Sequence, residues 1–234
     1  MKVQRLRLTF ARGDEAKELS HLEVMRALEQ AMREAGLPLA YSEGRRSTAQ
    51  ISIAAPLPVS VTSSCDLADV FLSERVDPTR FVAALQATLP PGLEALSARE
   101  VGLALPALQT QVRWAEYEVD VANGGSSAAD VRRAIGDLLA TRSLPWEHQR
   151  EKKVQRYDLR PLVLGLRLET EGEGIYRLMM RLRIGQDRSG RADQVVAALG
   201  LESPLRIHRC SLYEKRTSNA VQAYRRLDES EEER

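Results

Sequence analysis

The succession of alternating and helical segments constrains the fold of this chain more than any other feature of its sequence. Residues 3–10, VQRLRLTF, alternate apolar and polar side chains, a pattern typical of a half-buried strand. Residues 19–36, LSHLEVMRALEQAMREAG, then repeat apolar residues at helical spacing. Ser20 and Glu23 form the S-x-x-E pattern of a capping box, and Gly36 is a suitable residue just past a helix end. The sequence therefore predicts a strand followed by a helix with both of its ends.

The rest of the first half continues this order. IAAPLPVS (53–60) contains two prolines and is expected at a sheet edge or a turn. DLADVFLS (66–73) predicts a strand, on which Asp66 and Asp69 point to opposite faces and are unsuited to a shared acid–base role. Asp77-Pro78 opens a second helix, and LEALSAREVGL (93–103) predicts a final strand. The order β-α-β-β-α-β is that of the split βαβ, or ferredoxin-like, fold.

The second half repeats the same order of predicted strands and helices. AEYEVDV (115–121) alternates cleanly, SSAADVRRAIGDLLA (126–140) is a capped amphipathic helix, and LVLGLRL and GIYRLMMRLRI predict two strands. GRADQVVAALG and PLRIHRCSLYEK then predict a short helix and a closing strand. We therefore predict an α+β protein of two tandem ferredoxin-like domains with antiparallel sheets. Their predicted bounds are residues 1–106 and 107–216, followed by a C-terminal extension, 217–234, with an acidic tail.

Composition narrows the setting of such a protein. The apolar runs are far shorter than the roughly 18 residues of a membrane span, and the N-terminus lacks the apolar core of a signal peptide. Two isolated cysteines give no zinc pattern and no disulfide framework, so a cytoplasmic protein is expected. Residues 107–227 hold 21 Lys and Arg against 15 Asp and Glu. This basic second half favours an anionic partner, although arginines that merely decorate the surface would give the same count.

Sequence patterns for catalysis are absent. No G-x-x-x-x-G-K-[ST], G-x-G-x-x-G, G-x-S-x-G or H-E-x-x-H pattern occurs. His21 falls in the first turn of the first helix, where a polar residue filling that position is favoured over an acid or base. His148 and His208 lie in a basic loop and a strand, and they offer no metal-ligand spacing. We therefore predict no catalytic residue, no metal site and no cofactor.

Two basic segments are the candidate binding sites. WEHQREKKVQRYDLRP (146–161) mixes cations with Trp146 and Tyr157, and such segments bind phosphates while their aromatic faces stack on unpaired bases. YSEGRRSTAQIS (41–52) combines a turn glycine with two arginines and hydroxyl groups. The predicted anion-binding or nucleic-acid-binding residues are Ser42, Gly44, Arg45, Arg46, Arg150, Lys152, Lys153, Arg156 and Arg160.

A third basic element is the strand YRLMMRLRI (176–184). Arg177, Arg181 and Arg183 alternate with apolar residues, which predicts a basic face on an open sheet. The other interpretation is an exposed strand kept soluble and monomeric by its arginines.

The sequence also resembles a known family. Residues 5–44, RLRLTFARGDEAKELSHLEVMRALEQAMREAGLPLAYSEG, are similar to the start of the radical SAM-linked protein family, a domain of unknown function. AEYEVDV, KKVQRYDLRPLVLGL and IHRCSLYEK match later segments, so the resemblance covers roughly residues 3–216. The residues that match the family signature are Ser20, His21, Tyr41, Ser42, Glu43, Gly44 and Asp158.

The resemblance implies a partner. Members of that family are encoded beside, or fused to, a radical SAM enzyme, often near ribonuclease and ribosomal-protein genes. The resemblance therefore implies an accessory protein of a radical SAM enzyme in RNA or ribosome metabolism. After YSEG the family continues with a His- and Pro-rich run, whereas this chain has RRSTAQ at 45–50. No family role of that histidine can be transferred here.

Three functions stay open from the sequence. The first is a non-catalytic protein that partners a radical SAM enzyme and contacts RNA. The second is an RNA-processing or RNA-modifying enzyme, whose candidate groups are His21, Tyr41, Ser42 and Arg46. The third is a module that binds protein alone, with its arginines solvated. We expect the first two to place both basic segments on one surface and the third to place them on opposed surfaces.

Overall fold

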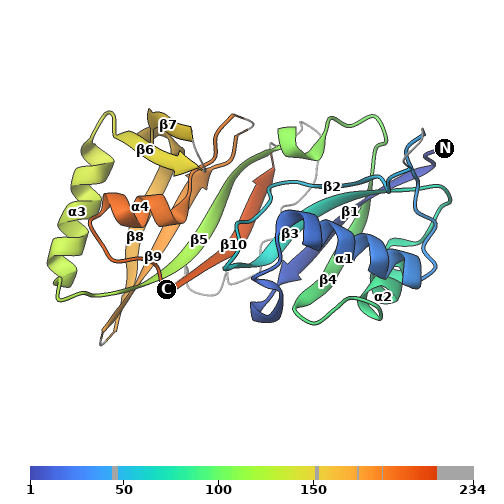
Figure 1. Ribbon diagram of the computed structural model, residues 1–234, viewed down its shortest axis with the longest axis horizontal. Helices are drawn as coiled ribbons and strands as arrows, with labels where there is room; N and C mark the ends of the chain where they lie inside the picture. Colours follow the sequence, from blue (N-terminus) through green and yellow to red (C-terminus); the bar gives the residue numbers. More distant parts are fainter. Residues whose placement is uncertain (44–46, 151–152, 173, 186, 215–234) are drawn as a thin grey trace, which may run out of the picture.

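One large sheet, mostly antiparallel, runs through both halves of the chain (Figure 1). The structure is a computed structural model, and it describes residues 1–43, 47–150, 153–172, 174–185 and 187–214. Within these residues the strand order is β4-β1-β3-β10-β5-β9-β8, with β2 paired to β3 beside this path. The described residues also form four α-helices, so the predicted α+β class is confirmed.

The first half contributes four strands and two helices in the predicted order. Its strands lie side by side as β4-β1-β3-β2, and each neighbouring pair is antiparallel. A short 3-10 turn, η1, precedes the first helix. The bounds are β1 (Gln4–Arg12), η1 (Asp14–Ala16), α1 (His21–Glu34), β2 (Ile51–Ile53), β3 (Val61–Leu72), α2 (Pro78–Gln86) and β4 (Leu93–Val101).

The second half repeats this arrangement and adds a hairpin. Its main strands lie in the order β10-β5-β9-β8, again with antiparallel neighbours, and the hairpin β6–β7 forms a separate two-stranded sheet. The bounds are η2 (Leu108–Thr110), β5 (Val112–Ala122), α3 (Ala128–Ala140), β6 (Pro145–Arg150), β7 (Lys153–Asp158), η3 (Arg160–Leu162), β8 (Val163–Glu171), β9 (Ile175–Arg183), α4 (Ala192–Ala198) and β10 (Arg206–Glu214).

Helix α1 begins and ends as the sequence predicts. The Ser20 hydroxyl accepts a hydrogen bond from the Glu23 backbone N–H at 3.4 Å, and the Glu23 carboxylate accepts one from the Ser20 N–H at 2.8 Å. Gly36 has φ +66°, a left-handed conformation that favours glycine. The Leu37 N–H then donates to the Met32 carbonyl at 3.0 Å, which completes a Schellman ending. Both predicted caps are confirmed.

Each half has its own hydrophobic core. In the first half, the apolar side of β1 and β3 packs against α1 and α2; in the second half, β5 and β9 pack against α3 and α4. The first core includes Leu6, Leu8, Phe10, Val24, Leu28, Met32, Ala68, Val70, Phe81 and Leu85. The second includes Val119, Val121, Val131, Ile135, Leu138, Leu178, Met180, Leu182, Val195 and Val196.

Strand β3 connects the two cores. One of its edges pairs antiparallel with β2 and, nearer its start, parallel with β10 through Val61↔Ile207 and Ser63↔Arg209. Val61 belongs to the second core, together with Leu57 from the turn before β3, whereas later residues of β3 belong to the first core. Between Ser63 and Asp66 the register shifts by one residue against β1, so both stretches face the same side of the sheet. The helices and the two cores therefore share one face of the common sheet.

The other face of β1 differs from the prediction of a half-buried strand. The side chains of Arg5 and Arg7 are almost fully buried, because both pair with Asp69 and because the segment after β4 crosses over them. The carbonyls of Leu105 and Pro106 accept hydrogen bonds from Arg5 at 2.6 and 2.9 Å. Alternation predicted which side chains point away from the core, but not that the linker between the halves would cover them.

Asp66 and Asp69 do point to opposite faces of β3, as predicted. Asp66 pairs with Arg209 on the helix side, and Asp69 pairs with Arg5 and Arg7 on the other. A second correction concerns the basic loop around His148, which instead forms the hairpin β6–β7. Among the residues that the structure describes, no helix has the length and apolarity needed to cross a membrane.

Candidate functional site

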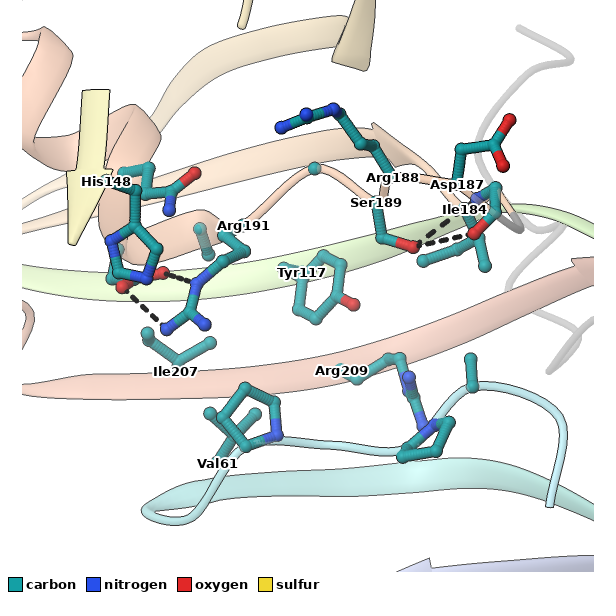
Figure 2. A pocket seen from close by; sticks show the side chains of 18 of the residues that line it. Val61, Tyr117, His148, Ile184, Asp187, Arg188, Ser189, Arg191, Ile207 and Arg209 are labelled. Carbon is teal, nitrogen blue, oxygen red and sulfur yellow. Dashed lines mark hydrogen bonds and ion pairs between the residues drawn. The ribbon is translucent and has the colours of Figure 1, made fainter. Parts of the chain in front are cut away.

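A cavity of about 580 Å³ lies on the helix side of the sheet, where the two halves meet (Figure 2). Six segments form its walls: residues 54–61 before and at the start of β3, Gln109 of η2, the middle of β5, the inner side of the hairpin β6–β7, residues 184–185 and 187–194, and residues 207–209 of β10. This volume lies within the roughly 300–1,000 Å³ range of small-molecule pockets. The junction of the halves is thus hollow enough to receive a ligand.

The loop between β9 and α4 forms one wall of the pocket. The chain turns sharply at Gly185. A side chain there would clash, because its Cβ atom would lie 2.6 Å from the Arg188 carbonyl oxygen. The Ser189 hydroxyl accepts a hydrogen bond from the Gly185 N–H at 3.3 Å, and the Gly190 N–H donates to the Arg183 carbonyl at 2.8 Å. These contacts hold the loop and present Arg188 and Ser189 to the pocket (Figure 2).

Two arginines of this segment supply positive charge. The Arg188 guanidinium lies over the Tyr157 ring, 4.5 Å from the ring centroid. Arg191 pairs with Asp193 at 2.9 Å, and this hydrogen-bonded carboxylate raises the pKa of Arg191. His148 lines the same pocket from strand β6 (Figure 2). Asp187 and Asp193 also line the pocket, so an anion would meet Arg188 directly and would compete with Asp193 for Arg191.

Gln194 contributes an uncharged polar group to the pocket. Its side chain is only 4% exposed, and its Oε1 atom accepts a hydrogen bond from the Tyr157 hydroxyl. Its Nε2 atom is buried and has no hydrogen-bond partner among the described residues. Burial raises the pKa of Tyr157, so this hydroxyl remains protonated at neutral pH. An amide that is buried and half satisfied at a pocket wall is the kind of group that a ligand completes.

The pocket floor contains a fixed charge pair. The Arg209 guanidinium is 1% exposed and pairs with Asp66, with one N–H···O distance of 3.2 Å. Burial opposes its charge, but the Asp66 carboxylate prevails and raises the pKa of Arg209. Tyr117 lies opposite Arg209 on the neighbouring strand, and burial raises the pKa of its hydroxyl (Figure 2). Since these groups neutralise one another, the floor holds the two halves together and adds little net charge to the pocket.

The basic segment 146–161 lies partly at this pocket. Gln155 and Tyr157 line it from β7. Arg156 instead pairs with Glu147 across the exposed side of the hairpin at 2.8 Å. The predicted residues Arg150 and Lys153 stand at paired positions of the hairpin backbone, and Lys152 lies outside the described residues.

Asp158 and Arg160 hold the base of the hairpin. The Asp158 carboxylate accepts hydrogen bonds from the N–H groups of Leu144 and Arg160 at 2.8 and 3.0 Å, and these bonds, the Leu144 one first, lower the pKa of Asp158. The Arg160 guanidinium donates to the carbonyls of Leu139 and Val163 at 2.8 and 2.7 Å. These contacts give both residues a structural part in joining α3, the hairpin and β8.

The other basic segment lies elsewhere. Gly44, Arg45 and Arg46 are outside the described residues. The residues on either side of them are joined by a hydrogen bond, which the Ser42 hydroxyl accepts from the Thr48 N–H at 3.1 Å. Leu39 bridges to Leu72, at the end of β3, whereas the pocket adjoins Val61, at its start. The described flanks of this loop are therefore separated from the pocket by most of a 12-residue strand.

The remaining family-signature residues lie in the first half. Ser20 caps α1, and His21 is exposed at the first position of that helix. Tyr41 bridges to Ala49 across the loop, and the neighbouring Glu43 is exposed. The structure does not bring these residues to the pocket.

The open face of the sheet is less cationic than the sequence indicates. The predicted alternation of Arg177, Arg181 and Arg183 with buried apolar residues is confirmed. However, Arg177 pairs with Asp120 at 2.7 Å and Arg181 with Glu116 at 2.8 Å. Arg181 also lies over the Trp114 ring, which stacks on Tyr213 with ring centroids 3.4 Å apart, and these contacts occupy both groups.

Sequence reasoning missed the pocket residues Arg188, Arg191 and Gln194. The run GQDRSGR, 185–191, did contain a signal, because glycine, aspartate and serine cluster in loops and here flank two arginines. Gln194 gave no signal, since a glutamine in a short helix is ordinary. Only the folded structure reveals that its amide is buried at a pocket.

Together, fold and site define a two-part α+β protein with a ligand-sized pocket between its halves. The chain belongs to a family described as an uncharacterized protein conserved in bacteria (DUF2344), whose profile matches residues 5–192. The match ends before β10, the strand that joins the two half-sheets.

The chain is distantly similar to several solved structures. The chain is similar to part of a crystal structure of a Cbf5-Nop10-Gar1 complex, with 11% identity, a TM-score of 0.45, and coverage of 87% of this chain and 48% of that one. A crystal structure of the archaeal box H/ACA sRNP Nop10-Cbf5 complex gives 10% identity, a TM-score of 0.43, and coverage of 86% and 46%. A crystal structure of an unknown protein from Galdieria sulphuraria has 16% sequence identity and a TM-score of 0.26, and the match covers 90% of this chain and 98% of that one. The chain thus spans about half the length of the first two, and no curated protein matches it.

Proposed function

We propose that this chain is a non-catalytic binding protein that holds RNA at the pocket between its halves and accompanies a radical SAM enzyme. The observation that supports the RNA contact is the convergence of Arg188, Arg191 and His148 with an aromatic ring at one pocket wall. Guanidinium groups bind phosphates in two-point contacts, and aromatic rings stack on unpaired bases.

The architecture that we propose is a pair of ferredoxin-like domains, residues 1–106 and 107–216. The strand orders β4-β1-β3-β2 and β10-β5-β9-β8 support it, because each alternates with two helices in the β-α-β-β-α-β sequence. In this proposal the hairpin β6–β7 is an insertion of the second domain, which brings part of the basic segment to the pocket.

The radical SAM partner is supported by the resemblance of residues 5–44 and the later matching segments alone. Purification of the tagged full chain from its native cells tests it. We expect a radical SAM protein among the bound proteins, and RNA retained when nuclease is omitted. Recovery without any radical SAM protein would remove the partner from the proposal and leave the RNA contact to be judged separately.

Fluorescence anisotropy with a labelled single-stranded RNA of random sequence tests the RNA contact. Wild-type protein should bind at low salt, and an Arg188→Gln, Arg191→Gln double variant should bind less tightly. Loss of two phosphate contacts should also make the slope of log affinity against log salt shallower by about 1.4. An Arg26→Gln, Arg33→Gln double variant is the matched control, because both residues are exposed on α1.

Equal binding by the pocket variant and the α1 control would refute RNA binding at the pocket. If wild-type protein itself does not bind RNA at low salt, a module that binds protein alone becomes the better account. Two observations already favour this second candidate: the ion pairs of Arg177 and Arg181 on the open face, and the distance along β3 between the described flanks of the two basic segments. The native purification would then recover protein without RNA.

A further inference from the structure

We infer that the pocket receives a single nucleoside phosphate, with the base edge on the Gln194 amide and the phosphate on Arg188 and Arg191. This inference rests on the proposed function and specifies what that site binds. The ligand can be one unstacked nucleotide of an RNA or a free nucleotide, because both present the same groups.

Gln194 supplies the contact for the base. Its Nε2 atom is buried without a partner, while its Oε1 atom is held by the Tyr157 hydroxyl. If the amide were turned by half a rotation, the oxygen would become the atom without a partner. In either orientation one amide atom at the pocket wall remains to be satisfied, and a base edge offers both donors and acceptors for it. A purely apolar ligand would leave that atom unpaired at a cost in affinity.

The shape of the pocket fits a flat group beside this amide. Pro56 and Pro58 line one wall from the first half, and the Tyr157 ring lines another from the hairpin. Proline and tyrosine rings present flat apolar surfaces, against which a planar base packs well. The half-buried Tyr157 is fixed by its hydrogen bond to Gln194. Because the Arg188 guanidinium covers one face of its ring, a base would pack on the other face or displace Arg188.

The phosphate side lies on residues 187–191. Arg188 is exposed and lies over the Tyr157 ring, and Arg191 faces the pocket while paired with Asp193 (Figure 2). Asp66 meets the charge of Arg209, and Asp193 meets that of Arg191, so an incoming anion is directed first to Arg188. Arg188, Arg191 and the Gln194 amide, all within residues 187–194, would contact the two ends of the ligand.

Isothermal titration calorimetry of the full chain tests the inference with three probes: a set of the four ribonucleoside 5′-monophosphates, ribose 5-phosphate and a 12-nucleotide RNA. We expect at least one monophosphate to bind about tenfold more tightly than ribose 5-phosphate, which lacks the base. Gln194→Met should remove this preference, whereas Gln30→Met, an exposed change on α1, should keep it. Tyr157→Phe, which leaves the ring but releases the amide, should weaken the preference in part.

The outcomes separate the inference from the proposed function. If RNA and a monophosphate both bind and both depend on Gln194, the ligand is a nucleotide of RNA. If the monophosphate binds and RNA does not, the ligand is a free nucleotide, and the RNA proposal fails while the inference holds. If RNA binds while no monophosphate is preferred over ribose 5-phosphate on wild-type protein, the inference is overturned and the proposal stands. If nothing binds, both are wrong; because this reading uses wild-type protein, it does not depend on the folding of any variant.

Discussion

At the residue scale, most buried charges among the described residues belong to ion pairs; the exception is Arg12, whose guanidinium donates to the carbonyls of Ala16, Lys17 and Leu19. Arg209 with Asp66, and Arg5 and Arg7 with Asp69, are each nearly inaccessible and lie on opposite faces of the sheet. Removing one partner from such a pair leaves a buried charge without compensation. These pairs therefore constrain the region where the two halves meet more strongly than the exposed ion pairs of the surface do.

Asp66→Asn tests this role directly. The change leaves the Arg209 guanidinium buried beside a neutral amide, and we expect the free energy of unfolding to fall by about 3–5 kcal/mol. Urea denaturation followed by circular dichroism measures it. Arg75→Gln removes an exposed pair with Glu100 and should cost less than about 1 kcal/mol. A loss of similar size in both variants would contradict the account.

His208 gives the junction a dependence on pH. Its Nδ1 and Nε2 atoms lie 2.7 Å from the Thr62 hydroxyl and 3.3 Å from the Ser64 hydroxyl, across the β10–β3 pair. Burial, and next the charge of Arg206, lowers the pKa of His208 below its usual 6.5. As pH falls below 6.5, His208 therefore binds a proton in the unfolded chain before it does so in the folded protein. The free energy of unfolding is highest above pH 6.5 and decreases as pH falls towards the pKa of His208 in the folded protein.

The measurement is the free energy of unfolding at pH 7.5 and pH 5.5 for wild-type protein and His208→Asn. Wild-type protein should lose more stability between these two pH values than the variant does, because only wild-type protein carries an imidazole at position 208. Equal losses in the two proteins would show that other groups set the pH dependence.

At the element scale, local chemistry predicted most helices and strands correctly. Ser20, Asp77 and Ser127 each accept hydrogen bonds from the first-turn N–H groups of their helices, as their positions in the sequence indicate. The hairpin β6–β7 was missed because residues 147–156 contain one apolar residue and show no alternation. Its position depends instead on Tyr157 and Trp146, which pack against the second core, and on Asp158 at its base.

The caps give a prediction at this scale. Ser20→Ala removes the hydroxyl acceptor of the α1 capping box and should lower the free energy of unfolding by about 1 kcal/mol. Ser203→Ala, at an exposed loop serine, is the matched control and should leave stability unchanged within about 0.5 kcal/mol. Urea denaturation of the three proteins makes the comparison, and an unaffected Ser20 variant would show that the cap adds nothing in this context.

At the scale of the whole molecule, the two halves are not independent. The second core includes Ala54, Ala55, Leu57 and Val61, all contributed by the first half. No sequence pattern predicted that residues of the first half would pack in the second core, or that a pocket would lie beside them. Periodicity predicts the two faces of one element, but not which distant segments pack together. The order of elements could therefore be predicted from the sequence, whereas the pocket depends on the tertiary arrangement of six segments.

Shared packing predicts joint unfolding. Calorimetric unfolding of residues 1–214 should give a single transition, and Leu57→Ala should lower its midpoint even though most of the core that it disturbs lies in the second half. A buried leucine truncated to alanine typically costs 2–5 kcal/mol. Two separate transitions, with only one of them shifted by the substitution, would contradict the coupling of the halves.

The central claim, that RNA is held at the pocket between the halves, is tested most directly by photo-crosslinking. RNA containing 4-thiouridine is irradiated with the full chain, and mass spectrometry locates the modified peptides. The account predicts crosslinks in residues 145–158 and 184–194, around Tyr157 and Arg188. Crosslinks confined to the open face, at Trp114 and Tyr213, would contradict it.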